Sequence, residues 1–149
     1  MSAKQKIEIH QSVPGVVLTA ENKCSYCKNS KCCTYITIEI DKPKKRSDFD
    51  ELLWQVSHKN ISFYKDEDGW FMNVEAVCDH LGDQGKCGIY ETRPTICRDY
   101  SNDFCELDEP AEEGFDLHFT NYDELLAYCR KRFKNWDKKW QKKWAKKNG

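Results

Sequence analysis

Apolar residues along the chain recur with two periods, one typical of strands and the other typical of helices. Residues 34–40 read TYITIEI, and this alternation predicts a half-buried strand. The inward face of that strand would carry Ile36, Ile38 and Ile40. Two further apolar runs, residues 61–65 and 70–74, flank an Asp-Glu-Asp-Gly segment that favours a tight turn, so they predict a β-hairpin.

A helical period replaces this alternation between residues 47 and 58. Apolar residues recur there every three or four positions, at Phe49, Leu52, Leu53 and Val56. Ser47 can cap the first turn, with Asp50 completing an approximate capping box. We therefore expect a short amphipathic helix.

The longest helical pattern runs from about residue 120 to the C-terminal end, with Thr120 or Asn121 as the N-cap. Lysines occupy most of its surface, and its apolar stripe consists of Tyr122, Leu125, Leu126, Cys129, Phe133, Trp136, Trp140 and Trp144. This pattern predicts one long, basic, amphipathic helix. The preceding residues 103–116 contain seven acidic residues, which is typical of a surface loop with little order.

Together these elements predict a small, irregular α+β domain. With 149 residues, of which 39% are hydrophobic, the chain can bury one modest core. We expect a short antiparallel sheet, a short helix and the long C-terminal helix, all stabilised by a metal centre. The cysteine-rich domain would comprise residues 1–118, and the basic helix, residues 119–149, would pack on it or project from it.

The charge of the chain is strongly polarised, although its net charge is only −1. From Arg130 onward there are ten Lys or Arg residues and one acid, Asp137, so this segment carries +9 and the remainder −10. Such asymmetry predicts either a polyanion or protein partner for residues 130–147, or packing of the basic helix on an acidic face of its own domain. The tryptophan stripe fits core packing, a nucleic-acid or membrane surface, or the groove of a partner.

No stretch of the sequence has the length and apolar character of a signal peptide or of a segment that crosses a membrane. We therefore expect a cytoplasmic protein. In that reducing compartment, nine cysteines favour thiolate ligands over disulfides, and an odd number also fits a disulfide framework poorly.

Eight of the cysteines form two groups that together predict a metal site. The first group lies in the segment CSYCKNSKCC and contains Cys24, Cys27, Cys32 and Cys33. The second group follows the predicted hairpin and contains Cys78, Cys87, Cys97 and Cys105. Two thiols spaced C-x2-C can bind one ion, and a closed tetrahedral zinc site needs four soft ligands, so eight thiolates would fill two sites. We predict a metal cage that is split between the two groups, with ligands exchanged between them.

Two further residues are weaker ligand candidates. Cys129 lies on the apolar stripe, which favours a core thiol over a ninth ligand. His80 follows Cys78 by two residues and could replace a cysteine, but a solvated or hydrogen-bonded loop histidine is the simpler interpretation. The negative charge of bound thiolates would be offset by the basic residues Lys31, Lys86, Arg93 and Arg98.

A second motif follows the CSYCKNSKCC segment, formed by Cys87, Ile89, Tyr90, Arg93, Pro94, Cys97, Arg98 and Tyr100. Together the two motifs resemble the CxxCxxCC cysteine-cluster family, which is described as zinc- or iron-chelating. The second gap of the first motif has four residues here instead of two, which leaves open whether Cys32 or Cys33 lies nearer the C-x2-C pair. The resemblance, over about residues 24–105, implies a small metal-binding domain, most of whose relatives have no assigned activity. A similar domain in flagellin lysine methylases looks like an iron–sulfur centre.

The residues and the resemblance leave two classes of function open. The first is a non-enzymatic metal-binding domain with two Zn²⁺ ions, whose binding free energy is largely folding free energy. The second is an enzyme for redox chemistry or lysine methyl transfer that uses iron or a [4Fe–4S] cluster. The sequence contains no glycine-rich dinucleotide fingerprint, no C-x3-C-x2-C radical motif and no obvious acid–base pair, which favours the first class. No catalytic residue is predicted.

Overall fold

The computed structural model describes residues 15–17, 19, 22–27, 30–100, 105 and 110–148 of the chain, without the side chains at positions 23, 25, 139, 140 and 143. Much of the acidic segment predicted at residues 103–116, namely 103, 104 and 106–109, lies outside this description. The chain divides into two compact units, each made from two stretches of sequence. The first comprises residues 1–36 and 76–114 and contains eight of the nine cysteines; the second comprises residues 37–75 and 115–149.

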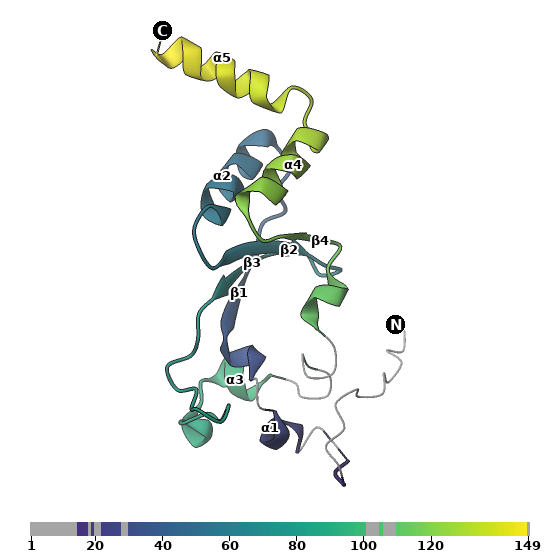
Figure 1. Cartoon of the computed structure of the whole chain (residues 1–149), viewed down its shortest axis with the longest axis vertical. Coiled ribbons are helices and arrows are strands. Elements are labelled where there is room, and N and C mark those ends of the chain that lie inside the picture. The colour runs from purple at the N-terminus through teal and green to yellow at the C-terminus, as the bar shows by residue number, and fades with distance from the viewer. Residues whose placement is uncertain are drawn as a thin grey trace. The chain divides into compact units, whose positions relative to one another are not determined.

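A four-stranded sheet gives the structure its β component (Figure 1). Its strand order is β1-β3-β2-β4, with β1 at Tyr35–Ile40, β2 at Ile61–Lys65, β3 at Trp70–Glu75 and β4 at Leu117–Phe119. The predicted hairpin is confirmed, because β2 pairs antiparallel with β3 and places Phe63 opposite Met72. On its other side β2 pairs antiparallel with β4, a strand of three residues that is too short for its period to be read from the sequence.

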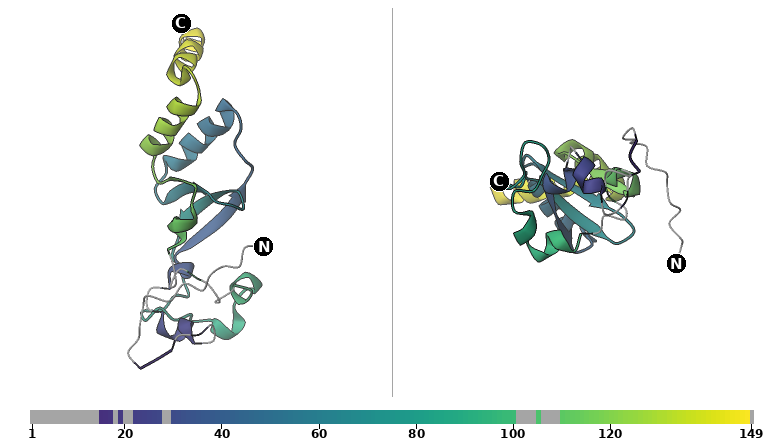
Figure 2. Two further views of the ribbon diagram at one scale, coloured as in Figure 1. Left: turned by 90° about the vertical axis from the view of Figure 1, so that its right-hand side faces the viewer. Right: turned by 90° about the horizontal axis from the view of Figure 1, so that it is seen from below.

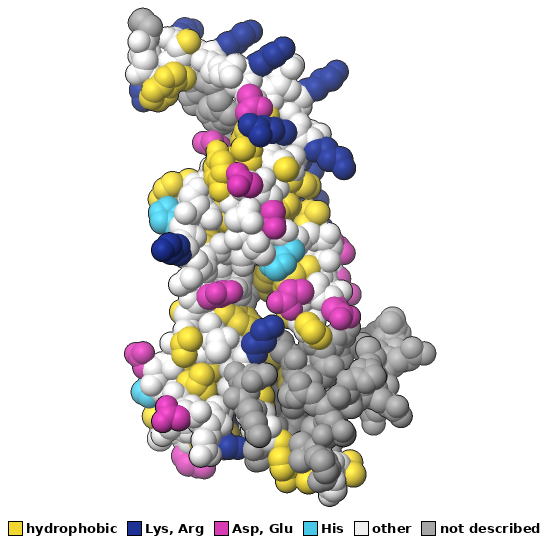
Figure 3. Space-filling view, viewed as in Figure 1, with side chains coloured by type: hydrophobic (Ala, Val, Ile, Leu, Met, Phe, Trp, Pro, Cys, Tyr) yellow, Lys and Arg dark blue, Asp and Glu magenta, His cyan; other side chains and the backbone are white. Residues whose placement is uncertain are grey.

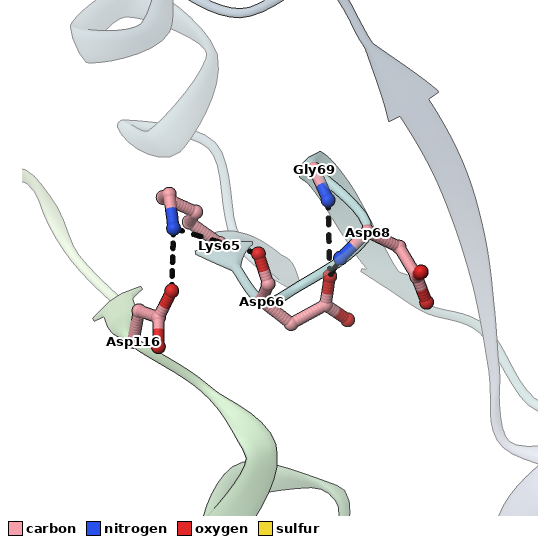
Figure 4. Close-up of polar contacts among 5 residues, drawn as sticks. All are labelled: Lys65, Asp66, Asp68, Gly69 and Asp116. Atoms are coloured by element: carbon pink, nitrogen blue, oxygen red, sulfur yellow. Dashed lines mark hydrogen bonds and ion pairs between the residues drawn. The ribbon is translucent and has the colours of Figure 1, made fainter. Parts of the chain in front are cut away.

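The hairpin turn is closed by a single carboxylate. Asp66 Oδ1 accepts hydrogen bonds from the backbone N–H groups of Asp68 at 2.9 Å and Gly69 at 3.2 Å (Figure 4). Gly69 has a φ of 149°, a conformation that side-chain-bearing residues rarely adopt. The ammonium group of Lys65 pairs with the carboxylate of Asp116, so the end of β2 is held to the residue that precedes β4.

The predicted short helix is confirmed as α2, Arg46–Val56, but its predicted cap is wrong. The helix begins before Ser47, and the capping carboxylate belongs to Asp48 instead of Asp50. Asp48 Oδ2 accepts from the backbone N–H groups of Lys44 at 2.9 Å and Lys45 at 3.0 Å. These two bonds stabilise the charged carboxylate and hold the pKa of Asp48 below its usual value.

The C-terminal pattern forms two helices, so the prediction of one long helix is wrong. α4 spans Tyr122–Arg132 and α5 spans Trp136–Asn148. Between them Phe133 is extended, and Asn135 is left-handed with a φ of 58°, a conformation that Asn tolerates better than most residues. Arg46 of α2 stabilises this break, because its guanidinium donates to the backbone carbonyls of Lys134 at 3.0 Å and Trp136 at 2.7 Å. The break therefore depends on a contact from a distant part of the sequence.

The core of the second unit lies where α2 and α4 pack on one face of the sheet (Figures 1 and 2). Its buried members are Phe49, Leu52, Leu53, Val56, Phe63, Trp70, Phe119, Leu125, Cys129 and Trp136. Phe49 is central, since its ring lies 6.1, 5.7 and 5.4 Å from the rings of Trp70, Tyr128 and Phe133. The apolar periodicity of α2 and α4 thus corresponds to real burial.

The strand predicted at residues 34–40 is confirmed as β1, but its predicted burial is only partly correct. Ile40 packs against the core, whereas Ile36 and Ile38 are 55% and 43% exposed. β1 is an edge strand of the sheet, and alternation along a strand cannot show whether another element covers its apolar face. Among the described helices, none combines the length and apolar character needed to cross a bilayer.

Candidate metal centre

The first two cysteines lie on and next to a single helical turn. α1 spans Lys23–Tyr26 and carries Cys24, and the chain becomes extended at Cys27. Residues three apart on one helical turn lie on the same side, so this turn brings Cys24 and Cys27 together. The local structure therefore agrees with the C-x2-C spacing of a metal-binding pair.

Cys32 and Cys33 lie on the 3₁₀ helix η1, Lys31–Cys33. Successive residues of a 3₁₀ helix leave the axis about 120° apart, so adjacent side chains can reach different neighbours. Ser30 begins this turn in the left-handed conformation, with a φ of 37°, and is buried. Its hydroxyl donates to the carbonyl of Gly85 at 2.5 Å, and its own carbonyl accepts from the N–H of Cys33 at 2.8 Å. Ser30 thus holds the Cys32–Cys33 pair against the loop that follows Cys78, a role that no sequence motif revealed.

The second group of cysteines joins the first through the backbone. The N–H of Cys78 donates to the carbonyl of Cys33 at 2.8 Å. Beyond Cys78 the chain folds back on itself, because Leu81 forms an antiparallel bridge with Cys87 and the N–H of Gly88 donates to the carbonyl of His80 at 2.7 Å. A Cβ at Gly88 would lie 3.2 Å from that carbonyl oxygen, which leaves little room for a side chain. This loop places Cys78 and Cys87 beside Cys33.

Cys97 lies on α3, Thr95–Arg98, in a segment that two arginines stabilise. Arg98 donates to the carbonyls of Arg93 at 2.9 Å and Glu91 at 2.6 Å. Glu91 belongs to the 3₁₀ helix η2, Tyr90–Thr92. Arg93 donates to the carbonyl of Tyr90 at 2.8 Å, and its guanidinium carbon lies 3.7 Å from the centre of the Tyr90 ring. Both arginines are therefore engaged in holding the loop that carries Cys97.

The thiols that affect the pKa of Cys32 differ from those that affect the pKa of Cys33. Burial of its sulfur, together with the nearby thiols of Cys33, Cys27 and Cys24, raises the pKa of Cys32 to about 12. Burial also raises the pKa of Cys33, against a hydrogen bond with Cys32 that lowers it. The additional increase at Cys33 comes from a different set of thiols, Cys78, Cys87 and Cys97. The first group of cysteines thus acts on the pKa of Cys32 and the second on that of Cys33, and the backbone bond between Cys33 and Cys78 agrees with the latter.

The donor chemistry of this region fits a thiophilic ion. None of the nine cysteines, all within the described residues, forms a disulfide, and eight of them lie in the first unit. Within the described residues, however, no three Cys, His, Asp or Glu side chains lie close enough together to hold a metal ion. Burial and neighbouring thiols raise the pKa of Cys32 and Cys33, and a bound cation would oppose this effect by favouring the thiolates.

The two weaker ligand candidates differ from the eight. Cys129 is 0% exposed and belongs to the core of the second unit, where burial raises the pKa of its thiol to about 11. This confirms the interpretation of Cys129 as a core thiol. His80 is an exposed loop residue whose backbone carbonyl takes part in the loop that follows Cys78.

An acidic hollow of about 350 Å³ lies beside the hairpin turn in the second unit. Its lining includes Glu39, Asp41 and residues 65–70. The Asp66 carboxylate closes the turn and Lys65 pairs with Asp116, as Figure 4 shows, so these groups have structural roles. The hollow carries no convergent set of ligands among the described residues.

The comparison with known families identifies the class to which the chain belongs. Residues 23–143 match the model of the CxxCxxCC family, whose description is "Putative zinc- or iron-chelating domain". The match covers most of the 149 residues, and the chain belongs to this family. It extends beyond the cysteines through α4 and into α5. The comparisons with curated proteins and with solved structures gave no match.

Proposed function

We propose that the chain is a non-enzymatic metal-binding domain that holds two Zn²⁺ ions on eight thiolates. The main observation in favour is the backbone hydrogen bond between Cys78 and Cys33, which joins two groups of cysteines from distant parts of the sequence. The family to which the chain belongs is described as zinc- or iron-chelating, which supports a soft-metal ligand set.

The two ions would divide the adjacent cysteines between them. One site would consist of Cys33, Cys78, Cys87 and Cys97, because the backbone bond between Cys33 and Cys78 and the Leu81–Cys87 bridge bring these segments together. The other would consist of Cys24, Cys27 and Cys32, with Cys105 as the fourth ligand because it is the remaining cysteine of the first unit. Each set then has the four thiolates that a closed tetrahedral zinc site requires.

A structural role follows from the position of these ligands. The first unit contains short helices and loops, and none of its described apolar residues belongs to the buried core. A domain of this kind needs cross-links, and metal coordination supplies them when the thiolates come from both ends of the unit. With all four positions of each ion taken by protein sulfur, no position remains for a substrate.

Elemental analysis of the purified chain tests this proposal. We expect about two zinc ions per chain, no visible absorption, and unfolding of the first unit when a strong chelator removes the metal. Cys24→Ser and Cys97→Ser should each lose metal, whereas Cys129→Ala should keep the full content, because Cys129 lies in the core of the second unit. A brown protein that contains iron and acid-labile sulfide after anaerobic purification would instead support a [4Fe–4S] centre. Full metal content in either serine variant would disprove the split cage.

A further inference from the structure

α5 begins in the core of the second unit and then leaves it. Trp136 is buried, and its carbonyl accepts from Arg46 of α2 at 2.7 Å. Arg130 of α4 pairs with Asp137 at 3.0 Å, so the first turn of α5 is fixed to its own unit. From Asp137 to Asn148 every described side chain is exposed, and Trp144 is 69% exposed. The outer part of α5 therefore presents a large apolar ring that the described residues leave uncovered.

The same part of α5 has an uncompensated positive charge. After Asp137 the only charged residues are six lysines, Lys138, Lys139, Lys142, Lys143, Lys146 and Lys147. Asp137 is already neutralised by Arg130. The four lysines with described side chains, at positions 138, 142, 146 and 147, form no ion pair with any residue that the structure describes. Figure 3 shows basic side chains projecting into solvent from this helix.

We propose that α5 docks along the surface of a lipid bilayer that contains anionic phospholipids. A cluster of four to eight lysines or arginines on an amphipathic helix is the usual basis of binding to anionic lipids, and α5 carries six. Tryptophan is enriched at the membrane–water interface, where its ring enters the headgroup region, and Trp144 is available for this. The 13 residues of α5 extend over about 20 Å, which is too short to span a bilayer but suits a helix lying in its surface.

The choice of basic residue favours lipid over nucleic acid. Beyond Arg132 every basic residue of the chain is lysine. Arginine provides the planar, two-pronged donor that recognises phosphate and guanine in nucleic-acid complexes. Lysine instead has a flexible aliphatic stem that can lie along an apolar surface while its ammonium group reaches the headgroups. The outer tryptophans of α5, at positions 140 and 144, have lysines between them and match this second arrangement.

Co-sedimentation of the full-length chain with phospholipid vesicles tests the proposal. We expect binding to vesicles that contain phosphatidylserine, no binding to pure phosphatidylcholine vesicles, and a strong decrease as salt is raised. Lys142→Gln with Lys146→Gln should weaken binding at least about tenfold, since each lysine near an anionic surface contributes several-fold. Trp144→Ala should also weaken it several-fold.

Matched variants exclude a general effect of charge or of exposed tryptophan. Lys44→Gln with Lys59→Gln removes the same charge elsewhere, and Trp54→Ala removes another exposed ring, 64% exposed, from α2. Both controls should bind vesicles like the unmodified chain. The proposal is wrong if anionic vesicles are not bound at low salt, if the controls lose as much binding as the α5 variants, or if α5 binds single-stranded nucleic acid in preference to lipid. The zinc content is independent of all these outcomes, because the variants leave every cysteine in place.

Discussion

The backbone N–H of Cys78 donates a hydrogen bond of 2.8 Å to the carbonyl of Cys33. This bond joins the two cysteine groups across a stretch of sequence that contains the hairpin and α2. It also places Cys33, and not its neighbour Cys32, at the contact between the groups. Four properties of the two units, beginning with this contact between the cysteine groups, can be tested by measurement.

The first prediction concerns the division of the adjacent cysteines between two ions. Cys32→Ser and Cys33→Ser should each reduce the zinc content from about two ions to about one, because each would remove one ligand of a different four-thiolate site. Combining Cys33→Ser with Cys97→Ser should cost no more metal than Cys33→Ser alone, since both ligands belong to one site. Combining Cys33→Ser with Cys24→Ser should remove both ions. Native mass spectrometry counts the ions. If Cys33→Ser with Cys24→Ser loses one ion and Cys33→Ser with Cys97→Ser loses both, Cys33 shares its ion with Cys24 and the assignment is wrong.

The second prediction concerns Ser30, which holds the Cys32–Cys33 turn to the loop at Gly85. Ser30→Ala removes the donor and leaves the Gly85 carbonyl without that partner, which should destabilise the first unit by about 1 kcal/mol. Because the turn would be held less firmly, zinc should also dissociate faster in a competition assay with a chromophoric chelator. Thr34→Ala is a suitable control, since the Thr34 hydroxyl donates within the same turn, to the carbonyl of Lys31. Equal zinc dissociation from the two variants would contradict this role of Ser30.

The third prediction concerns the core of the second unit. Phe49→Ala should destabilise this unit by about 3–5 kcal/mol, because Phe49 is fully buried among three aromatic rings and its loss leaves a cavity. Trp54→Ala on the exposed side of the same helix should change stability little. Cys129→Ser should cost about 1–3 kcal/mol by burying a hydroxyl group, with no loss of zinc. Urea denaturation followed by tryptophan fluorescence measures these differences, and loss of zinc from Cys129→Ser would show that Cys129 is a ligand.

The fourth prediction concerns pH and the start of α4. The Glu124 carboxylate accepts from the N–H of Thr120 at 2.7 Å and from its hydroxyl at 3.0 Å, and the backbone bond is the main reason why the pKa of Glu124 is lowered. A lowered pKa means that the charged form stabilises the fold above the ordinary value of 4.5 and that this contribution is lost as the pH falls further. Glu124→Gln should therefore lower the melting temperature at neutral pH.

The difference between Glu124→Gln and the unmodified chain should shrink as the pH falls below 4.5, because Glu124 then becomes protonated. Since the group is exposed, the effect at neutral pH should stay below about 1 kcal/mol. Glu51→Gln, an exposed position on α2, serves as the control. A difference that is independent of pH would mean that Glu124 acts through packing and not through its charge.

Several features followed directly from the sequence. The turn residues between two apolar runs predicted the β2–β3 hairpin, and the spacing of Phe49, Leu52, Leu53 and Val56 predicted both α2 and its buried face. These features are encoded within a few residues of each other, so periodicity and turn chemistry are sufficient. The cysteine motifs likewise indicated the family.

Other features depend on contacts between distant residues, and only the tertiary structure decided them. The C-terminal helical pattern is continuous in sequence, yet the helix breaks at Asn135, where Arg46 donates to the carbonyls of Lys134 and Trp136. β4 exists because β2 offers it an edge, and Ile36 and Ile38 remain exposed although their alternation is regular. The sequence left open which of the two adjacent cysteines meets the second group, and the structure joins Cys33 to Cys78 through the backbone. A local pattern determines what a segment can form, whereas its partners determine where it ends and what it covers.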